Sequence, residues 1–342
     1  MSAIETAEPG SQPPATRGHH LRRFGRWVRD VGPAVALVLL VVLGIALNPS
    51  FLSWGNLSNV LTRSAFIGII SIGATFVIVT GGIDLSVGAM AALVASLMII
   101  IMNRLTQTGW AAPTAVAVGI VAGVLFGFLA GLTNGLLTAK GKIDSFIVTL
   151  GTMGIFRSLV TFLASGGTLT LNSTVREAYR PVYYNEWLNL PIPVWVLALV
   201  VVAGTIVLTK TRFGRYCRAV GSNPDVALYS AIEVNRIRIA AFVVQGFCVA
   251  LATLLYVPRL GSASAQTGLG WELEAITAVV VGGTALRGGS GRIWGSIAGA
   301  LILTLIGNLL NLTSIISVYL NGAVQGVIIL GAALLQRGSR SR

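Results

Sequence analysis

Long apolar runs separated by short polar stretches follow one another along almost the whole chain. Each run holds about 15 to 25 residues, and a helix needs about 20 mostly apolar residues to cross the hydrocarbon core of a bilayer. Ten such runs can be delimited, at residues 33–50, 61–80, 87–103, 112–138, 145–165, 191–209, 237–257, 271–286, 293–311 and 314–335. The pattern therefore predicts an all-α fold, a polytopic transmembrane helix bundle of about ten membrane helices.

The polar segments between and beyond these runs indicate how the chain is organised. Residues 1–32 are polar and basic, and they are too long and too polar for the n-region of a cleaved signal. We therefore expect a cytoplasmic N-terminal tail, a transmembrane domain over residues 33–335 and a basic cytoplasmic tail at 336–342. Two connections are longer than a simple turn: a polar and aromatic loop at 166–190, and a basic loop of helical character at 210–236.

Lysine and arginine residues are concentrated on one side of the predicted membrane. If the N-terminus is cytoplasmic, seventeen of them fall in cytoplasmic segments and four in segments on the opposite side. This imbalance is the positive-inside bias of membrane proteins. Because an odd number of helices would place the two basic tails on opposite sides, an even number with both termini cytoplasmic is favoured.

The composition fits a membrane protein and argues against nucleic-acid binding. Hydrophobic residues make up 54% of the 342 residues and charged residues 10%, and the mean hydropathy is +0.82. Soluble globular chains carry about 25% charged residues, so much of this protein's surface must face lipid. The net charge of +13 is spread between the apolar runs and over both ends. It does not form the basic patch that a nucleic-acid interface needs.

Glycine spacing indicates how the helices pack. Three consecutive GxxxG steps occur at Gly123, Gly127, Gly131 and Gly135. Small residues four apart let helix backbones approach closely in lipid, so a compact bundle is expected. The spacing carries no information on a substrate.

The motifs of the common enzyme classes are absent from the sequence. There is no GxxxxGK[ST] phosphate loop and no HExxH metal motif, and both histidines, His19 and His20, lie in the polar tail. Cys217 and Cys248 have no CxxC partner and are expected to be unpaired thiols. We therefore predict no catalytic, cofactor-binding or metal-binding residues in this chain.

Few charged residues lie inside the apolar runs. Proton- or ion-coupled transporters usually carry acids or histidines within their helices as relay groups. Asp84 is the one acid that adjoins membrane segments on both sides. The energy for any transport is therefore expected from a partner. Arg157 lies within a run and is expected to snorkel to the interface or to meet a partner such as a helix C-terminus.

Four stretches of the chain, with a fifth near its C-terminus, resemble one family in their order and spacing. They are Gly81–Gly88 (GGIDLSVG); Gly131–Gly151, with GLTNG and KGKIDSFIVTLG at its ends; Thr211–Ser230, with TRFGR and AVGSNP; Glu274–Gly295, with EAITAVVVGGT and GGSG; and Asn321–Gly326 (NGAVQG). The family comprises the permeases of ribose-, xylose-, arabinose- and galactose-type ABC importers. The resemblance covers residues 60–335.

The resemblance implies the membrane-spanning permease subunit of an ATP-driven ABC importer in the bacterial plasma (inner) membrane. In such an assembly two permease subunits, identical or paralogous, form the pathway. An ATP-binding cassette ATPase docks on the cytoplasmic side and binds ATP and Mg²⁺, and a periplasmic binding protein delivers a monosaccharide. The permease itself is then no enzyme and holds no cofactor.

Three other functions compete with this interpretation. A permease of the same family could carry a non-sugar polar solute. A self-sufficient channel or secondary transporter would carry its solute without any ATPase. A membrane enzyme would be active as the isolated chain, and the absent motifs argue against it.

The resemblance assigns the basic loop at 210–236 to coupling with the ATPase. A short helix at about 224–234, with apolar side chains, could lie in a groove of the ATPase as a rigid lever. Spacing alone fits a solvated connecting loop equally well. The residues that match the family pattern in this loop are Gly214, Arg215, Gly221, Asn223, Ala227 and Ser230.

Neutral amides and one acid in or beside the apolar runs are candidates for the translocation path. Amides both donate and accept hydrogen bonds, as an uncharged sugar requires, but they serve helix–helix packing equally well. For Asp84, capping of the following helix is the competing interpretation. The candidate residues are Asp84, Asn134, Gln245, Asn308, Asn321 and Gln325.

Overall fold

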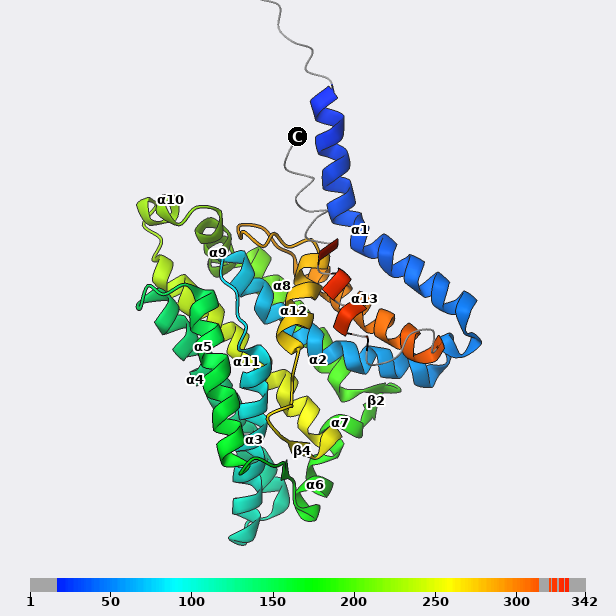
Figure 1. Ribbon diagram of the computed structural model, residues 1–342, viewed down its shortest axis with the longest axis vertical. Helices are drawn as coiled ribbons and strands as arrows, with labels where there is room; N and C mark the ends of the chain where they lie inside the picture. The colour runs from blue at the N-terminus through cyan, green and yellow to red at the C-terminus, as the bar shows by residue number, and fades with distance from the viewer. Residues whose placement is uncertain (1–16, 314–319, 321, 325, 329, 332–342) are drawn as a thin grey trace, which may run out of the picture.

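The computed structural model describes residues 17–313, 320, 322–324, 326–328 and 330–331 (Figure 1). The longer elements are α1 (Arg17–Leu47), α2 (Trp54–Val79), α3 (Val87–Gln107), α4 (Ala112–Ala139), α5 (Ser145–Leu163), α8 (Ile192–Lys210), α9 (Arg212–Ser222), α11 (Val234–Leu260), α12 (Trp271–Val281) and α13 (Ile293–Thr313). The shorter ones are η1 (Pro49–Leu52), β1 (Leu169–Thr170), α6 (Ser173–Tyr179), α7 (Pro181–Tyr184), β2 (Glu186–Trp187), β3 (Leu190–Pro191), α10 (Pro224–Tyr229) and β4 (Ser262–Ala263). The strands form only two short antiparallel pairs, β1 with β4 and β2 with β3. The predicted all-α class is confirmed.

Seven helices of the described part are long and apolar enough to cross a membrane, namely α2, α3, α4, α5, α8, α11 and α13. Each coincides with one of the predicted apolar runs. Most of the first predicted run, 33–50, lies in α1, which ends at Leu47, extends back into the predicted tail and has a shorter apolar part, Gly32–Leu47. The last predicted run, 314–335, falls mostly outside the described residues.

The predicted crossing at 271–286 differs most from the structure. Helix α12 holds 11 residues, which span about 16 Å at 1.5 Å per residue, whereas the hydrocarbon core is about 30 Å thick. The helix begins after Gly270 and ends before Gly283, and both glycines are left-handed, with φ of 85° and 87°. Residues 261–270, which precede α12, contain no helix. We call residues 261–270 the interrupted segment.

Helix α2 runs through the centre of the bundle, and 94% of its most apolar stretch is buried. It packs against α8, α11, α12 and α13. A stretch of helix that is enclosed by other helices does not need a polar face, which explains why residues 65–79 of α2 are mostly apolar on all sides.

Helices α4 and α11 share the most extensive helix–helix contact of the described part. A Cβ on Gly246 would overlap the carbonyl oxygen of Gly127, and one on Gly127 would lie 2.6 Å from the carbonyl oxygen of Gly246. Gly131 and Gly135 continue this contact against α11. The predicted GxxxG packing is therefore present at three of its four glycines, while a Cβ on Gly123 would meet Met98 of α3.

The connections of the bundle gather at two ends. Figure 1 shows α9 and α10 at one end of the bundle, and α6 and β4 at the other. The loops at 80–86, 140–144 and 282–292 lie at the α9–α10 end, as their mutual contacts show. We call this the basic end, because these connections carry many of the lysine and arginine residues of the described chain. The longer loop at 164–191 lies at the opposite end, in agreement with the predicted separation of charge.

Candidate functional site

The loop at 210–236 contains two short helices, α9 and α10. The Oγ1 of Thr211 caps α9 by accepting a hydrogen bond from the backbone N of Gly214 at 3.3 Å. At the junction the Oδ1 of Asn223 caps α10 by accepting from the backbone N of Val226 at 3.1 Å. Such caps supply acceptors for the free amides at the start of a helix, so the corner between α9 and α10 is set by local sequence.

Helix α10 is shorter than the helix predicted at about 224–234. It ends at Tyr229, and the Oγ of Ser230 donates to the carbonyl oxygen of Val226 at 2.9 Å. Ala231 then takes a left-handed conformation with φ of 59°. A left-handed residue breaks the helical hydrogen-bond pattern, and the chain turns there toward α11.

Helix α9 is amphipathic and packs on the bundle through one side. Gly214, Cys217 and Val220 are buried, whereas Arg212 and Arg215 are exposed. Buried residues three apart share one face of a helix. The guanidinium groups therefore lie on the outer side of α9, at the basic end.

Helix α10 exposes apolar side chains at the basic end. Val226, Leu228 and Tyr229 are 58%, 61% and 89% exposed, whereas Ala227 is buried. They lie at the end of the bundle and not along its long sides (Figure 1). Exposed apolar groups gathered in this way mark an interaction surface, and a short helix that carries them fits the helix-in-groove mode.

The end of α9 contacts two other segments closely through backbone atoms. A Cβ on Gly221 would overlap the carbonyl oxygen of Val79, the last residue of α2, and would lie 2.5 Å from the backbone N of Gly289. That backbone N of Gly289 donates to the carbonyl oxygen of Val79 at 2.9 Å. A Cβ on Gly288 would lie 2.9 Å from the carbonyl oxygen of Gly221. We call Val79, Gly221, Gly288 and Gly289 the glycine contact; it joins α9 to the end of α2 and to the loop after α12.

A group of polar residues lies inside the bundle where the chain enters α3. The Oδ1 of Asp84 accepts hydrogen bonds from the backbone N and the Oγ of Ser86, at 2.8 and 2.7 Å. The Nδ2 of Asn134 on α4 donates to the Oγ of Ser86 at 2.8 Å. All three residues are buried. The structure thus brings two predicted path residues together, in an arrangement that fixes the turn immediately before α3. Asp84 bonds the N-cap residue Ser86 and not the first amides of α3, which have no side-chain cap, so a role of Asp84 in the path stays a prediction.

Two hydroxyl groups of α5 bind the backbone of the stretch that leads into α3. The backbone N of Ile83 donates to the Oγ of Ser145 at 3.0 Å, and the backbone N of Leu85 donates to the Oγ1 of Thr149 at 3.1 Å. Backbone amides that packing removes from water need acceptors within the protein. The two hydroxyl groups therefore stabilise an extended stretch between two membrane helices.

The start of α3 also touches the interrupted segment. A Cβ on Gly88 would overlap the carbonyl oxygen of Gly268 and would lie 2.5 Å from the Oε2 of Glu272. Sequence reasoning missed this contact, because the two glycines are far apart in the chain. The signal that could have found the break in the helix is the pair Gly268 and Gly270 inside an otherwise apolar stretch.

The other predicted path residues lie elsewhere. Gln245 is fully buried where α11 packs on α2. Asn308 exchanges two side-chain hydrogen bonds with Asn56, at 2.6 and 3.1 Å, between α13 and α2. Asn321 and Gln325 lie outside the described residues. A role of any of these residues in the translocation path stays a prediction.

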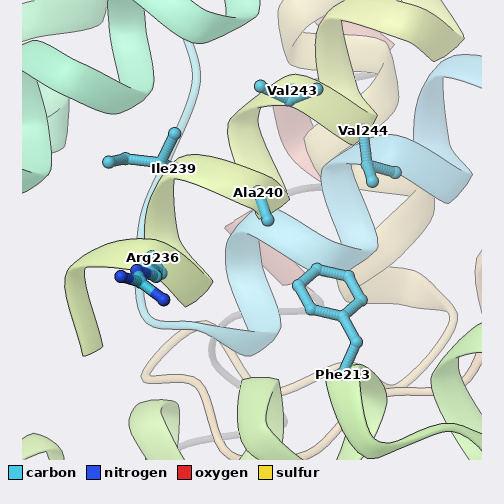
Figure 2. A pocket seen from close by; sticks show the side chains of 6 residues that line it. All are labelled: Phe213, Arg236, Ile239, Ala240, Val243 and Val244. Atoms are coloured by element: carbon cyan, nitrogen blue, oxygen red, sulfur yellow. The ribbon is translucent and has the colours of Figure 1, made fainter. Parts of the chain in front are cut away.

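Two cavities open at the basic end, on different sides of α11. One, of about 470 Å³, is lined by Phe213, Arg236, Ile239, Ala240, Val243 and Val244. Figure 2 shows the Phe213 side chain extending from α9, while the other lining residues lie along α11. The Nε of Arg236 forms an ion pair with the Oε2 of Glu233 at 2.6 Å. The other lining residues of this cavity are apolar.

The second cavity, of about 440 Å³, is polar. It lies between the loops at 80–86 and 140–144 and the start of α11, and Thr80, Lys142 and Arg238 are among its lining residues. Of the two cavities, it is the one whose lining can hydrogen-bond a polar solute.

Comparison with known proteins shows the family of the chain. A family model described as branched-chain amino acid transport system / permease component matches residues 56–333. The chain belongs to this permease family. It is therefore a multi-pass membrane component of an ABC transport system and is not itself catalytic, as the sequence motifs indicated.

Individual relatives align with nearly the whole length of this permease. The permease is 40% identical to the ribose import permease protein of Bacillus subtilis, over 92% of its own length and 94% of the length of that protein. It is 32% identical to the L-arabinose transport system permease protein of Escherichia coli, over 98% and 97% of the two chains. It is also 32% identical to the autoinducer 2 import system permease protein of Klebsiella pneumoniae, over 90% and 86%.

A solved structure shares the fold of the permease. It is described as an inward-facing conformation of a metal-chelate type ABC transporter, and the likeness covers 88% of the permease and 98% of that chain. The TM-score is 0.52 at 12% sequence identity. At this identity the likeness shows the fold alone.

The thiol of Cys217 tests how α9 packs in the permease. Cys217 is fully buried, and burial raises its pKa from 9.0 to about 12. Maleimides react with the thiolate, whose fraction at pH 8 this shift lowers by roughly a thousandfold. We expect mass spectrometry to find Cys217 unlabelled in the folded permease at pH 8 and fully labelled after denaturation.

The matched control is Arg215→Cys, a thiol on the exposed side of the same helix. It should be labelled in the folded permease under the same conditions. Labelling of Cys217 as fast as that of this control would contradict the described packing of α9.

Proposed function

We propose that this permease imports a monosaccharide that a periplasmic binding protein delivers, using ATP hydrolysed by a partner ATPase. The observation that carries the choice of substrate is the 40% identity to a ribose import permease over 92% of the chain. The arabinose relative points to the same class of solute. The family description names branched-chain amino acids, but these two relatives are named for pentose transport.

A second candidate substrate is autoinducer 2. The observation that favours it is the 32% identity to an autoinducer 2 import permease over 90% of the chain. This identity equals that of the arabinose relative, so an uptake assay must include both solutes beside ribose.

We propose ten membrane crossings with both termini in the cytoplasm. The seven long helices and the apolar part of α1 supply eight of them. The interrupted segment followed by α12 would supply the ninth. The tenth crossing, predicted from the sequence at 314–335, lies mostly outside the described residues. Non-helical backbone is tolerated at membrane depth where protein surrounds it, and the contact of Gly268 with Gly88 supports such burial.

The ATPase is proposed to dock on the exposed apolar side chains of α10. A movement of α10 would pass through α9 to the glycine contact and from there to the end of α2 and the loop after α12. Backbone groups in direct contact cannot yield by a change of rotamer, so this route is stiff. Of the predicted coupling residues, Gly214, Gly221 and Ala227 would serve by packing and Asn223 by capping.

The remaining partners belong to the same proposal. A second permease subunit, identical or paralogous, would complete the pathway, and the binding protein would approach the end that carries the 164–191 loop. ATP and Mg²⁺ would be held by the ATPase, and we propose no cofactor in this chain. The polar cavity at the basic end would form part of the exit route for the solute, because its lining can replace hydrogen bonds to water.

The experiment that tests this function is affinity purification of the tagged permease from gently solubilised membranes that contain its ATP-binding cassette protein. We expect the ATPase to copurify. The Tyr229→Asp variant should recover about tenfold less ATPase, because a charge would enter the apolar docking surface. Reconstitution with the binding protein and labelled ribose, arabinose or autoinducer 2 then identifies the solute.

The matched control is Tyr184→Asp, which alters a half-exposed tyrosine at the opposite end of the bundle. It should leave ATPase recovery unchanged. Recovery of the wild-type permease alone would favour a self-sufficient transporter. Equal recovery by Tyr229→Asp and wild type would contradict the docking surface on α10.

A further inference from the structure

Arg157 is a cation within the membrane helix α5, and it is half-buried. Side chains with charge are rare at such positions, because the hydrocarbon core offers them no water. When they occur, they mark a function or a specific partner. The structure supplies the partner.

The Nη1 of Arg157 donates hydrogen bonds to two backbone carbonyl oxygens of the interrupted segment. They belong to Ala265 and to Thr267, the latter at 2.7 Å. Carbonyl groups of non-helical backbone need donors at membrane depth. A guanidinium is always charged and presents several donors in one plane, so it can hold both groups at once.

The interrupted segment is folded into a compact turn that presents these carbonyls. The backbone N of Thr267 donates to the carbonyl oxygen of Ser264 at 3.0 Å, and the backbone N of Ser264 donates to the Oγ1 of Thr267 at 3.0 Å. Gly268 and Gly270 are left-handed, with φ of 67° and 85°. The turn is therefore defined by its own hydrogen bonds, and Arg157 ties it to α5.

The same turn is held on another side by α3. The carbonyl oxygen of Gly268 lies against Gly88 at the start of α3. The carboxylate of Glu272, in the first turn of α12, lies within electrostatic reach of Arg157. The interrupted segment is thus fixed between α3 and α5. Asp84, Ser86 and Asn134 position the start of α3, and Arg157 attaches the segment to α5.

We propose that Arg157 is a positioning residue of the transport step, which holds the interrupted segment against α5 so that the two move together. This inference rests on the proposed import function. Arg157 acts at a distance from the α9–α10 surface where the ATPase is proposed to dock. Its loss should therefore uncouple solute movement from ATP hydrolysis without affecting assembly.

The test compares wild type, Arg157→Gln and Arg157→Lys in proteoliposomes that also contain the ATPase and the loaded binding protein. Arg157→Gln should lower maximal uptake by about tenfold or more, because charge-assisted hydrogen bonds to two carbonyls are lost. Basal ATP hydrolysis and the binding-protein concentration for half-maximal uptake should stay unchanged. The number of ATP molecules hydrolysed per solute should rise. Arg157→Lys keeps the charge and should be intermediate.

The matched control is Arg63→Gln, which removes an exposed arginine of the membrane helix α2. It should keep wild-type uptake. Wild-type uptake by Arg157→Gln would overturn the proposal. A parallel fall in uptake, assembly and basal hydrolysis would assign Arg157 a purely structural role and also overturn it. If Arg157→Gln fails to assemble, Arg157→Lys decides: an intermediate ratio of uptake to hydrolysis supports the proposal, and a wild-type ratio overturns it.

The wild-type sample separates this inference from the function on which it rests. Uptake by wild-type vesicles that requires both the ATPase and the binding protein supports the proposed function whatever the variants do. Absence of such uptake would overturn the proposed function and, with it, the transport role of Arg157.

Discussion

Replacing Gly221 by leucine should abolish solute uptake while the protein still inserts into the membrane. A Cβ at this position would overlap the carbonyl oxygen of Val79 and lie 2.5 Å from the backbone N of Gly289. Neither group can move aside as a side chain could, so α9 must shift away from the bundle. Overpacking of this kind costs about 1–3 kcal/mol or more. The shift would separate α10 from the two segments through which we propose that its movement is transmitted.

Insertion should survive this change, because it depends on the apolar runs and not on the contacts of α9. Uptake in vesicles and the amount of protein in the membrane fraction would measure the two effects separately. Gly55→Leu is the matched control, because a Cβ on Gly55 would have no atom within 4 Å. Normal uptake by Gly221→Leu would rule out transmission through the glycine contact.

The second large effect is expected from Gly88→Ala, although it adds a single methyl group. That group would overlap the carbonyl oxygen of Gly268 and approach the Oε2 of Glu272 to 2.5 Å. The start of α3 must therefore separate from the interrupted segment, at a cost of about 1–3 kcal/mol. We expect a lower thermal unfolding temperature in detergent and a fall in uptake of about tenfold.

Gly151→Ala provides the comparison for this substitution. It adds the same methyl group to a membrane helix at a position with no atom within 4 Å. A glycine in a helix interior is less favourable than alanine, so this control should be neutral or slightly stabilising. If Gly88→Ala unfolds at the same temperature as Gly151→Ala, the described contact between Gly88 and Gly268 is wrong.

Local sequence was sufficient to predict the helices whose length and limits depend on nearby residues. Seven apolar runs form long helices. A helix pairs its backbone N–H and C=O groups within the same segment, so an apolar run of this length needs no distant partner. The helical character of the 210–236 loop was predictable, since Thr211 and Asn223 are strong caps. The overestimated length of α10 has an equally local cause, the left-handed Ala231, which its residue type does not predict.

Features that depend on distant residues could not be predicted. The run at 271–286 is apolar enough to suggest a full crossing, and the break before it is stabilised by Gly88 and Arg157 from other helices. Sequence reasoning left two outcomes open for Arg157, snorkelling to the interface or a partner such as a helix C-terminus; its partners are backbone carbonyl groups of the interrupted segment. The proximity of Asp84 and Asn134 depends on how α4 packs beside the start of α3, which no spacing encodes.

The glycine contact also bears on how such importers diversify. It involves main-chain atoms of Val79, Gly221, Gly288 and Gly289, and no side chain of α10 takes part in it. The outward residues of α10 are therefore free to vary with the ATPase they meet, provided that the glycines are kept. A permease built in this way could exchange its α10 for that of a relative and bind that relative's ATPase, while the glycine contact between α9 and the membrane helices remains the same.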